Sequence, residues 1–158
     1  MLCYHVLICV ILQLIVQLDL ILCLCDSLNY VIDLKDVKQA FENTYNALKK
    51  GGSFIFDIDS MYKMETILKD YDEENDEDDF YFHWHVDRIS KGYVKHSVEI
   101  IDKVENDRVY EEHYQKTYDV ETYIELLEKI GFKNIKLYSD FSKYGTECER
   151  VIFVCQKG

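Results

Sequence analysis

Leu18-Asp-Leu-Ile-Leu-Cys-Leu-Cys-Asp-Ser-Leu-Asn-Tyr30 is an apolar run that breaks into a polar turn. An amphipathic helical pattern follows, and then Gly51-Gly52 precedes a second apolar run that ends in acids, Ser53-Phe-Ile-Phe-Asp-Ile-Asp59. Strand, polar turn, helix, double glycine and strand in this order are typical of a βαβ crossover between parallel strands. The stretch therefore predicts an α/β fold in which Leu18–Leu24 and Ser53–Asp57 are neighbouring parallel strands.

The helical pattern covers Asp33–Lys50. Side chains at three- and four-residue spacing would form one inward stripe, namely Val37, Ala40, Phe41, Thr44, Tyr45 and Leu48. Asp33 stands where an N-cap carboxylate accepts hydrogen bonds from free backbone N–H groups. Lys49 and Lys50 suit the negative end of the helix dipole, and Gly51 can adopt the left-handed conformation that ends a helix. We therefore expect the helix to stop at Gly51.

The pattern changes to short strands after Asp59. Asp70–Asp79 carries eight acidic residues in ten and predicts a solvated loop. Three segments rich in aromatic and β-branched residues then predict an antiparallel meander, Phe80–Val86, Tyr93–Val104 and Arg108–Tyr118. A second amphipathic helix between Asp119 and Gly131 leads into two more predicted strands, Phe132–Tyr138 and Arg150–Gln156.

Two of these stretches resemble the class I S-adenosylmethionine-dependent methyltransferases. The strand, the turn Asp26-Ser-Leu-Asn29, the helix and Leu48-Lys-Lys-Gly-Gly52 resemble the family's fourth-to-fifth strand region. Leu126-Leu-Glu-Lys-Ile-Gly-Phe-Lys-Asn-Ile135 resembles its late helix and sixth strand. The resemblance implies a partial Rossmann-like, mostly parallel sheet over residues 18–158, with the antiparallel meander as an insertion at about residues 60–118.

The family's glycine-rich cofactor loop has no counterpart in this sequence. Glycine occurs only at positions 51, 52, 92, 131, 145 and 158, so there is no Gly-x-Gly, and no acidic residue precedes Asp19. The backbone of such a loop must approach the cofactor closely, which glycine permits. S-adenosylmethionine is the cofactor that the resemblance implies, and we expect this C-terminal part alone to bind it weakly or undetectably.

Two strand ends offer candidate site residues, because ligands of open α/β sheets bind beyond the carboxyl ends of the strands. The first end carries Asp26, Ser27, Asn29 and Tyr30, and the second carries Asp57. By resemblance, the first turn borders the methionine end of the cofactor and the substrate. The alternative is that Asp26 and Ser27 only stabilise a turn and that Asn29 bonds the backbone.

His113 is the candidate catalytic residue. It lies in Glu111-Glu-His-Tyr-Gln115, just before the second helix. Methyltransferases with an inserted meander, including some that methylate amines on small sugars, have a similar Glu-x-His strand. A neutral imidazole there could take a proton from an attacking amine or hydroxyl, and we expect His113 to share a cleft with Asp26 and Tyr30. The alternative is an ordinary strand histidine with a hydrogen bond.

We predict no metal site. His83 and His85 share a strand face with Asp87, but no further ligand converges on them in the sequence. A formal net charge of −12 argues against nucleic acid as a partner, since phosphate binding needs a basic face. The six cysteines lie in apolar contexts where free thiols are common, which favours a reducing, cytoplasmic location.

The apolar segment 1–17 has three interpretations. A signal peptide is disfavoured because no Lys or Arg precedes Lys35. A membrane helix over Val6–Cys25 has the required length, but it would bury Asp19 and has no basic flank. We favour a buried strand at Leu18–Leu24 preceded by residues that no longer encode the family's upstream elements.

The function implied by the resemblance is methyl transfer from S-adenosylmethionine to a small-molecule acceptor, impaired in this chain by the missing loop. The alternative is a non-catalytic remnant or partner-binding module. Such a module would associate through an exposed sheet edge, with a membrane anchor at residues 6–25 as a further variant.

Overall fold

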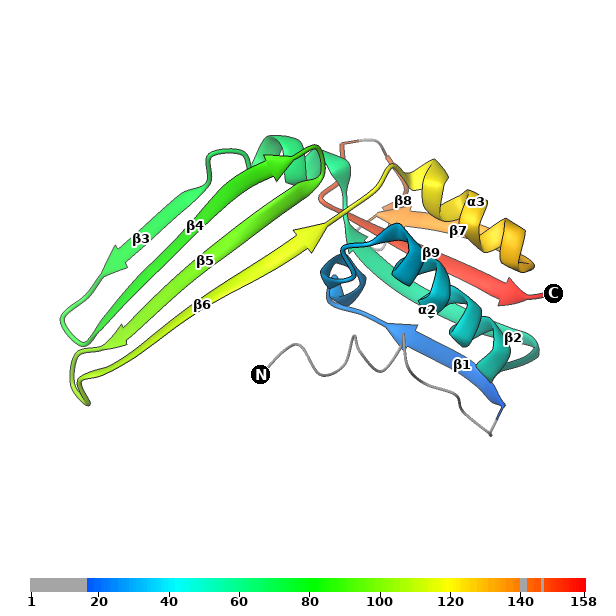
Figure 1. The fold of residues 1–158 in the computed structure, drawn as a ribbon, viewed down its shortest axis with the longest axis horizontal. Helices are drawn as coiled ribbons and strands as arrows, with labels where there is room; N and C mark the ends of the chain where they lie inside the picture. The colour runs from blue at the N-terminus through cyan, green and yellow to red at the C-terminus, as the bar shows by residue number, and fades with distance from the viewer. Residues whose placement is uncertain (1–16, 140–141, 146) are drawn as a thin grey trace.

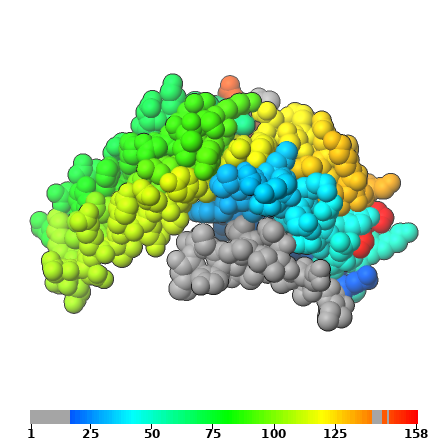
Figure 2. All heavy atoms as spheres, viewed as in Figure 1, coloured from blue at the N-terminus to red at the C-terminus, as the bar shows by residue number. Residues whose placement is uncertain are grey.

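Two sheets build the protein in the computed structural model, which describes residues 17–139, 142–145 and 147–158 (Figure 1). In spatial order, sheet A contains β1 (Leu18–Cys23), β2 (Leu48–Asp59), β9 (Arg150–Lys157), β7 (Phe132–Ser139) and β8 (Ser142–Lys143). Sheet B contains β3 (Asp72–Asp76), β4 (Phe80–Ser90), β5 (Tyr93–Asp102) and β6 (Asp107–Lys116). Sheet B projects from the body that sheet A and its helices form (Figure 2).

Sheet A has the predicted α/β character and is mixed in direction. β1 and β2 are parallel, with Ile21 opposite Phe54, as the βαβ pattern predicts. β9 runs antiparallel to both of its neighbours, β2 and β7. Hence β1, β2 and β7 point the same way, and β9 returns between β2 and β7. Sheet B is antiparallel throughout, which confirms the predicted meander.

Both long helices pack on one face of sheet A. They are α2 (Leu34–Ala47) and α3 (Val120–Ile130). The residues that build the core alternate along the strands and recur on the helix stripes, and they include Phe54, Phe56 and Ile58 of β2, Val151 and Phe153 of β9, Phe41 of α2, and Tyr123 and Leu127 of α3. Phe56 and Phe153 stack across the sheet with ring centroids 4.5 Å apart. This aromatic layer fixes the sheet beneath the helices.

The first helix is shorter than predicted. It ends at Ala47, and Leu48 already belongs to β2, where it pairs with Leu18 and is fully buried. Burying Leu48 beside β1 outweighs one more helical turn. Gly51 is left-handed, with φ +76, but inside β2 rather than at a helix end. Asp33 does stand at the N-cap, although its side chain makes no capping hydrogen bond.

Two short helical turns lie at the junction of the sheets, η1 (Ser27–Tyr30) and η2 (Lys63–Ile67). η2 supplies part of a second, small core that consists of Met64, Leu68, Val86 and Val94. The predicted insertion at about residues 60–118 contains η2 and all of sheet B. Its status as an insertion stays a prediction.

The acidic segment after η2 is not the predicted loop. Asp72–Asp76 forms β3, which pairs antiparallel with β4 although all five side chains are exposed. Hydrogen bonds from the histidines of β4 compensate for charge crowding there, since Asp72 contacts the rings of both His83 and His85.

The N-terminal alternatives are partly resolved. Since Leu18–Cys23 is a strand, residues 6–25 do not form one continuous helix. Across the described part of the chain, none of the helices is long and apolar enough to span a membrane. The remainder of that prediction, residues 1–16, lies outside the described residues.

Candidate functional site

A cavity of about 290 Å³ lies where the ends of β1 and β2 face the inner half of sheet B. Its lining residues come from η1, β2, η2 and the three long strands of sheet B, namely Asp26, Tyr30, Asp59, Lys63, Leu68, Trp84, His96, Val98, His113 and Gln115. Asp26, Tyr30 and His113 thus border one cavity, as predicted, while their chemical roles remain predictions. The position agrees with the rule that ligands bind beyond the carboxyl ends of the strands.

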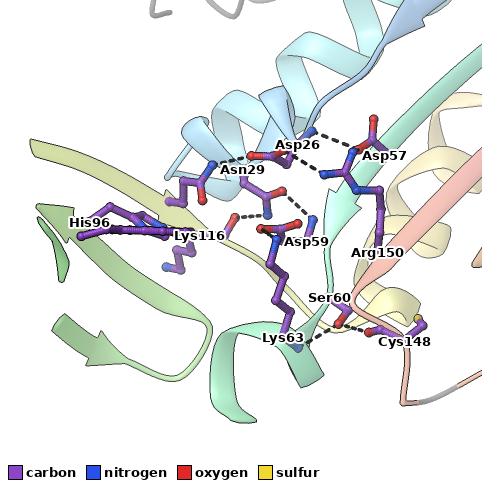
Figure 3. Close-up of polar contacts among 12 residues, drawn as sticks. Asp26, Asn29, Asp57, Asp59, Ser60, Lys63, His96, Lys116, Cys148 and Arg150 are labelled. Carbon is purple, nitrogen blue, oxygen red and sulfur yellow. Dashed lines mark hydrogen bonds and ion pairs between the residues drawn. The ribbon is translucent and has the colours of Figure 1, made fainter. Parts of the chain in front are cut away.

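Asp26 connects the two sheets. Its left-handed backbone, with φ +47, turns the chain out of β1 and into η1. Gln115 of β6 donates its amide N–H to Asp26 Oδ2 at 2.7 Å, and Arg150 of β9 approaches Oδ1 at 3.3 Å. The Asp26 N–H in turn donates to Asp57 Oδ2 at 3.0 Å (Figure 3). The Asp26 side chain is therefore held at the cavity wall by partners from β6 and β9, and its backbone by Asp57 of β2.

Asn29 is fully buried and is bonded to backbone on both sides. Its Oδ1 accepts from the Asp59 N–H at 2.8 Å, and its Nδ2 donates to the Lys116 carbonyl at 3.0 Å (Figure 3). Ser27 donates locally to the Leu24 carbonyl. These contacts agree with the alternative that Ser27 stabilises a turn and that Asn29 bonds the backbone.

His113 of β6 is oriented by its neighbours. Its Nε2 lies 3.1 Å from Glu111 Oε2, and its ring meets the Tyr30 ring edge-on at 6.1 Å between centroids. A carboxylate can only accept, so in a neutral imidazole Nε2 carries the hydrogen and Nδ1 keeps a lone pair. The arrangement leaves a basic nitrogen available on a residue that lines the cavity.

Sequence reasoning missed His96 and Lys63. His96 of β5 is directly opposite His113 of β6, and residues directly opposite each other share a sheet face. Lys63 of η2 forms an ion pair with Asp59 at 2.8 Å (Figure 3). Burial raises the pKa of Asp59, and the bonded Lys63 opposes that rise. The strand alternation of β5 could have indicated the face of His96, but nothing in the sequence reveals the register that sets it against His113.

A second cavity, of about 560 Å³, lies on the face of sheet A that the helices leave uncovered. It is lined by Leu22, Leu24, Cys25, Ile55, Asp57, Arg150 and Ile152. Arg150 Nη1 pairs with Asp57 Oδ2 at 2.8 Å, whereas the buried Asp57 Oδ1 has no hydrogen-bond partner. Asp57 therefore borders this second space rather than the first, and the Asp26–Arg150–Asp57 network separates the two cavities.

The histidines of β4 do not build a metal centre. No group of three or more potential ligands with suitable geometry occurs within residues 17–139, 142–145 and 147–158. Asp72 and Asp87 instead bond the exposed imidazole of His85, and hydrogen bonding to Asp72 is the largest cause that raises its pKa.

The chain is similar in sequence and in fold to known proteins. No protein-family model matches the chain. It is 31% identical over 145 residues to a provisionally named methyltransferase of Geobacillus sp. (strain WCH70), and 30% identical over 149 residues to another, YqeM of Bacillus subtilis (strain 168). These alignments cover 88% and 89% of this chain, and in each case 59% of the relative.

The structural comparison agrees. A crystal structure of an S-adenosylmethionine-dependent methyltransferase from Clostridium acetobutylicum ATCC 824 superimposes with a TM-score of 0.87 at 30% identity. The match covers 95% of this chain and 62% of that chain. The chain thus spans about three fifths of the length of the relatives it matches.

Proposed function

Because the chain corresponds in sequence and fold to part of a class I S-adenosylmethionine-dependent methyltransferase, we propose that the cavity between its sheets receives a small-molecule methyl acceptor. The observation that carries the proposal is the convergence of Asp26, Tyr30 and His113 on one space beyond the strand ends. A cavity of about 290 Å³ is at the lower limit of the size range of small-molecule sites, which fits a compact acceptor.

His113 would act as the general base. Its Nδ1 can take the proton of an acceptor amine or hydroxyl as the nucleophile attacks, while Glu111 stabilises the imidazolium that forms. Tyr30 and Gln115 restrict where the acceptor sits, because methyl transfer depends mainly on aligning the nucleophile with the transferred carbon. Asp26, held by Gln115 and Arg150, provides a carboxylate for a polar or cationic acceptor.

The described residues fit only part of the cofactor, which supplies an electrophilic methyl group when bound. Asp57 Oδ1 is a buried acceptor without a partner beside the larger cavity, and it could receive an ammonium group. The sequence contains no Gly-x-Gly, and no glycine precedes Gly51. We therefore expect that calorimetric titration of the 158-residue chain with S-adenosylmethionine will show no binding at micromolar concentration. A micromolar Kd would contradict this expectation.

The base assignment is tested by His113→Gln. At millimolar cofactor and with a panel of small amines and alcohols, we expect formation of S-adenosylhomocysteine to fall by about 10²–10⁴-fold in kcat, the usual contribution of a general base. Glu105→Gln, in the exposed β5–β6 turn, is the matched control and should leave the rate unchanged. Equal rates for His113→Gln and the parent chain would reject His113 as the base.

A partner-binding role is the second candidate, favoured by an exposed apolar strand. β1 is one of the two edge strands of sheet A among the described residues, and Leu20 and Leu22 within it and Leu24 just after it are each about half exposed. Such a strand can pair with a second copy of the chain. Light scattering should then show a dimer that Leu22→Lys dissociates, and a monomeric parent chain would exclude this candidate.

A further inference from the structure

One wall of the cavity presents a buried imidazole nitrogen without a partner. His96 is 7% exposed and lines the cavity, and its Nε2 makes no hydrogen bond. On the other side of the ring, the indole N–H of Trp84 donates to Nδ1 at 3.1 Å. Since Nδ1 acts as the acceptor, a neutral His96 must carry its hydrogen on Nε2. Trp84 therefore selects the tautomer that makes Nε2 a donor.

His96 is neutral at physiological pH. Burial lowers its pKa to about 4, the nearby His113 and Lys63 act in the same direction, and the Gln115 amide opposes them. A neutral donor differs in kind from the cation Lys63 and from the carboxylates of Asp26 and Asp59 that share the cavity. It can satisfy a hydroxyl, ether or carbonyl oxygen without adding charge.

Asp59 presents the complementary atom. Its Oδ2 pairs with Lys63 at 2.8 Å, but its buried Oδ1 has no partner. A buried polar atom without a partner costs free energy, and the cost is larger for a charged group than for a neutral one. The cavity thus contains a donor and an acceptor that make no hydrogen bond within the described chain, and a ligand or solvent can satisfy both.

We infer that the His96–Asp59 end of the cavity is a binding subsite for a small amino alcohol or polyol. In this subsite, a ligand oxygen accepts from His96 Nε2 and a ligand O–H or N–H donates to Asp59 Oδ1. Apolar amines and anions fit less well, because the first leave His96 unpaired and the second face two carboxylates. That this ligand is also the methyl acceptor rests on the proposed function.

The tautomer is tested first, by long-range proton–nitrogen NMR of the chain labelled with ¹⁵N-histidine. At neutral pH we expect His96 to be neutral with its hydrogen on Nε2, and Trp84→Phe to allow the other tautomer. A hydrogen on Nδ1 in the parent chain would overturn the proposal.

Binding is tested with three probes at equal millimolar concentrations: trans-2-aminocyclohexanol, cyclohexylamine and cyclohexanol. We expect the amino alcohol to shift the His96 Nε2 signal saturably, and each single-function probe to bind about tenfold more weakly, the usual effect of one lost hydrogen bond to a buried group. His96→Phe should abolish the selectivity, whereas His85→Gln, on the face of β4 opposite to the cavity-lining Trp84, should preserve it. An unshifted His96 signal, or equal shifts with cyclohexylamine, would overturn the proposal.

These measurements need no cofactor. Selective binding, together with no methyl transfer to the bound amino alcohol at millimolar S-adenosylmethionine, would therefore support the subsite and reject this ligand as the methyl acceptor, while methyl transfer with an unperturbed His96 would do the reverse.

Discussion

Sheet A and sheet B differ in how much of their apolar surface is buried. Sheet A is covered by α2 and α3 and contains the main core, including the stacked pair Phe56 and Phe153. Sheet B is longer and more exposed, with a small core only at its inner half, around Val86 and Val94. Its outer half is largely solvent-exposed, as Val109 illustrates at 46% exposure.

The difference shows how stability and ligand recognition are separated in this chain. Most apolar burial lies beneath the helices, whereas half of the cavity-lining side chains come from strands of sheet B, among them Trp84, His96 and Gln115. Those residues sit near the inner half, where the sheet is anchored against η1 and η2. The following predictions test whether the stabilising and the recognising regions are distinct, beginning with the largest expected effect.

Phe56→Ala should be the most damaging change. Phe56 is fully buried and contacts aromatic rings from both a helix and a neighbouring strand, so the cavity left behind should cost about 3–5 kcal/mol of unfolding free energy. Urea denaturation followed by circular dichroism measures this. Val109→Ala at the exposed part of sheet B should change the value by less than about 0.5 kcal/mol. Similar losses of unfolding free energy in Phe56→Ala and Val109→Ala would contradict the separation of a stabilising core in sheet A from the exposed part of sheet B.

Arg150→Met should rank second. It leaves the buried carboxylate of Asp57 without its cationic partner, which we expect to cost about 2 kcal/mol because Arg150 is itself half-exposed. The double variant Arg150→Met, Asp57→Asn should recover part of the loss. Arg108→Met removes an exposed ion pair with Glu99 on sheet B and should cost at most about 1 kcal/mol. A larger loss of unfolding free energy for Arg108→Met than for Arg150→Met would show that the ion pair of sheet B contributes more to stability.

The third prediction concerns pH and His96. Its pKa is about 4 when folded and about 6.5 when unfolded, so the unfolded chain binds more protons between these values. Its contribution to stability is therefore full above pH 6.5 and decreases as the pH falls toward 4. Between pH 7.5 and 5 the loss should be about 2 kcal/mol.

The variant His96→Gln isolates this effect, since His85 and Asp59, whose pKa values are raised, act with the opposite sign in both proteins. The parent chain should lose about 2 kcal/mol more than the variant over the same interval. Parallel stability curves for the two proteins would mean that His96 is not buried in a neutral state.

Gly92→Ala should have the smallest of these effects, at the inner end of sheet B. Gly92 has φ +63, and a Cβ there would lie 2.6 Å from the Thr117 carbonyl oxygen. We expect a loss of about 1–2 kcal/mol from the left-handed backbone, provided that the turn shifts to relieve the contact with Thr117. Gly145→Ala is the control, because a Cβ there would meet nothing within 4 Å. A neutral result at Gly92 would mean that the β4–β5 turn adjusts freely.

The local patterns of the sequence predicted most elements well. The apolar run at Leu18, the meander and the helix that stops at Gly131 all follow from periodicity and turn residues. The errors have a common cause. Leu48 was predicted in the helix but pairs with β1, and the acidic Asp72–Asp76 was predicted as a loop but forms a strand that pairs with β4. In both places, partners distant in sequence outweighed the local preference.

The sequence by itself determined the α/β class, the βαβ crossover and the position of Asp26 and Asn29 at a strand end. These features depend on side-chain periodicity and turn chemistry, which act over a few residues. Only the tertiary structure decided that His96 lies opposite His113, that Trp84 bonds its ring, and that Asp59 Oδ1 remains unpaired beside the same cavity. Register between strands and packing between sheets create these contacts, because they join residues that no local pattern relates.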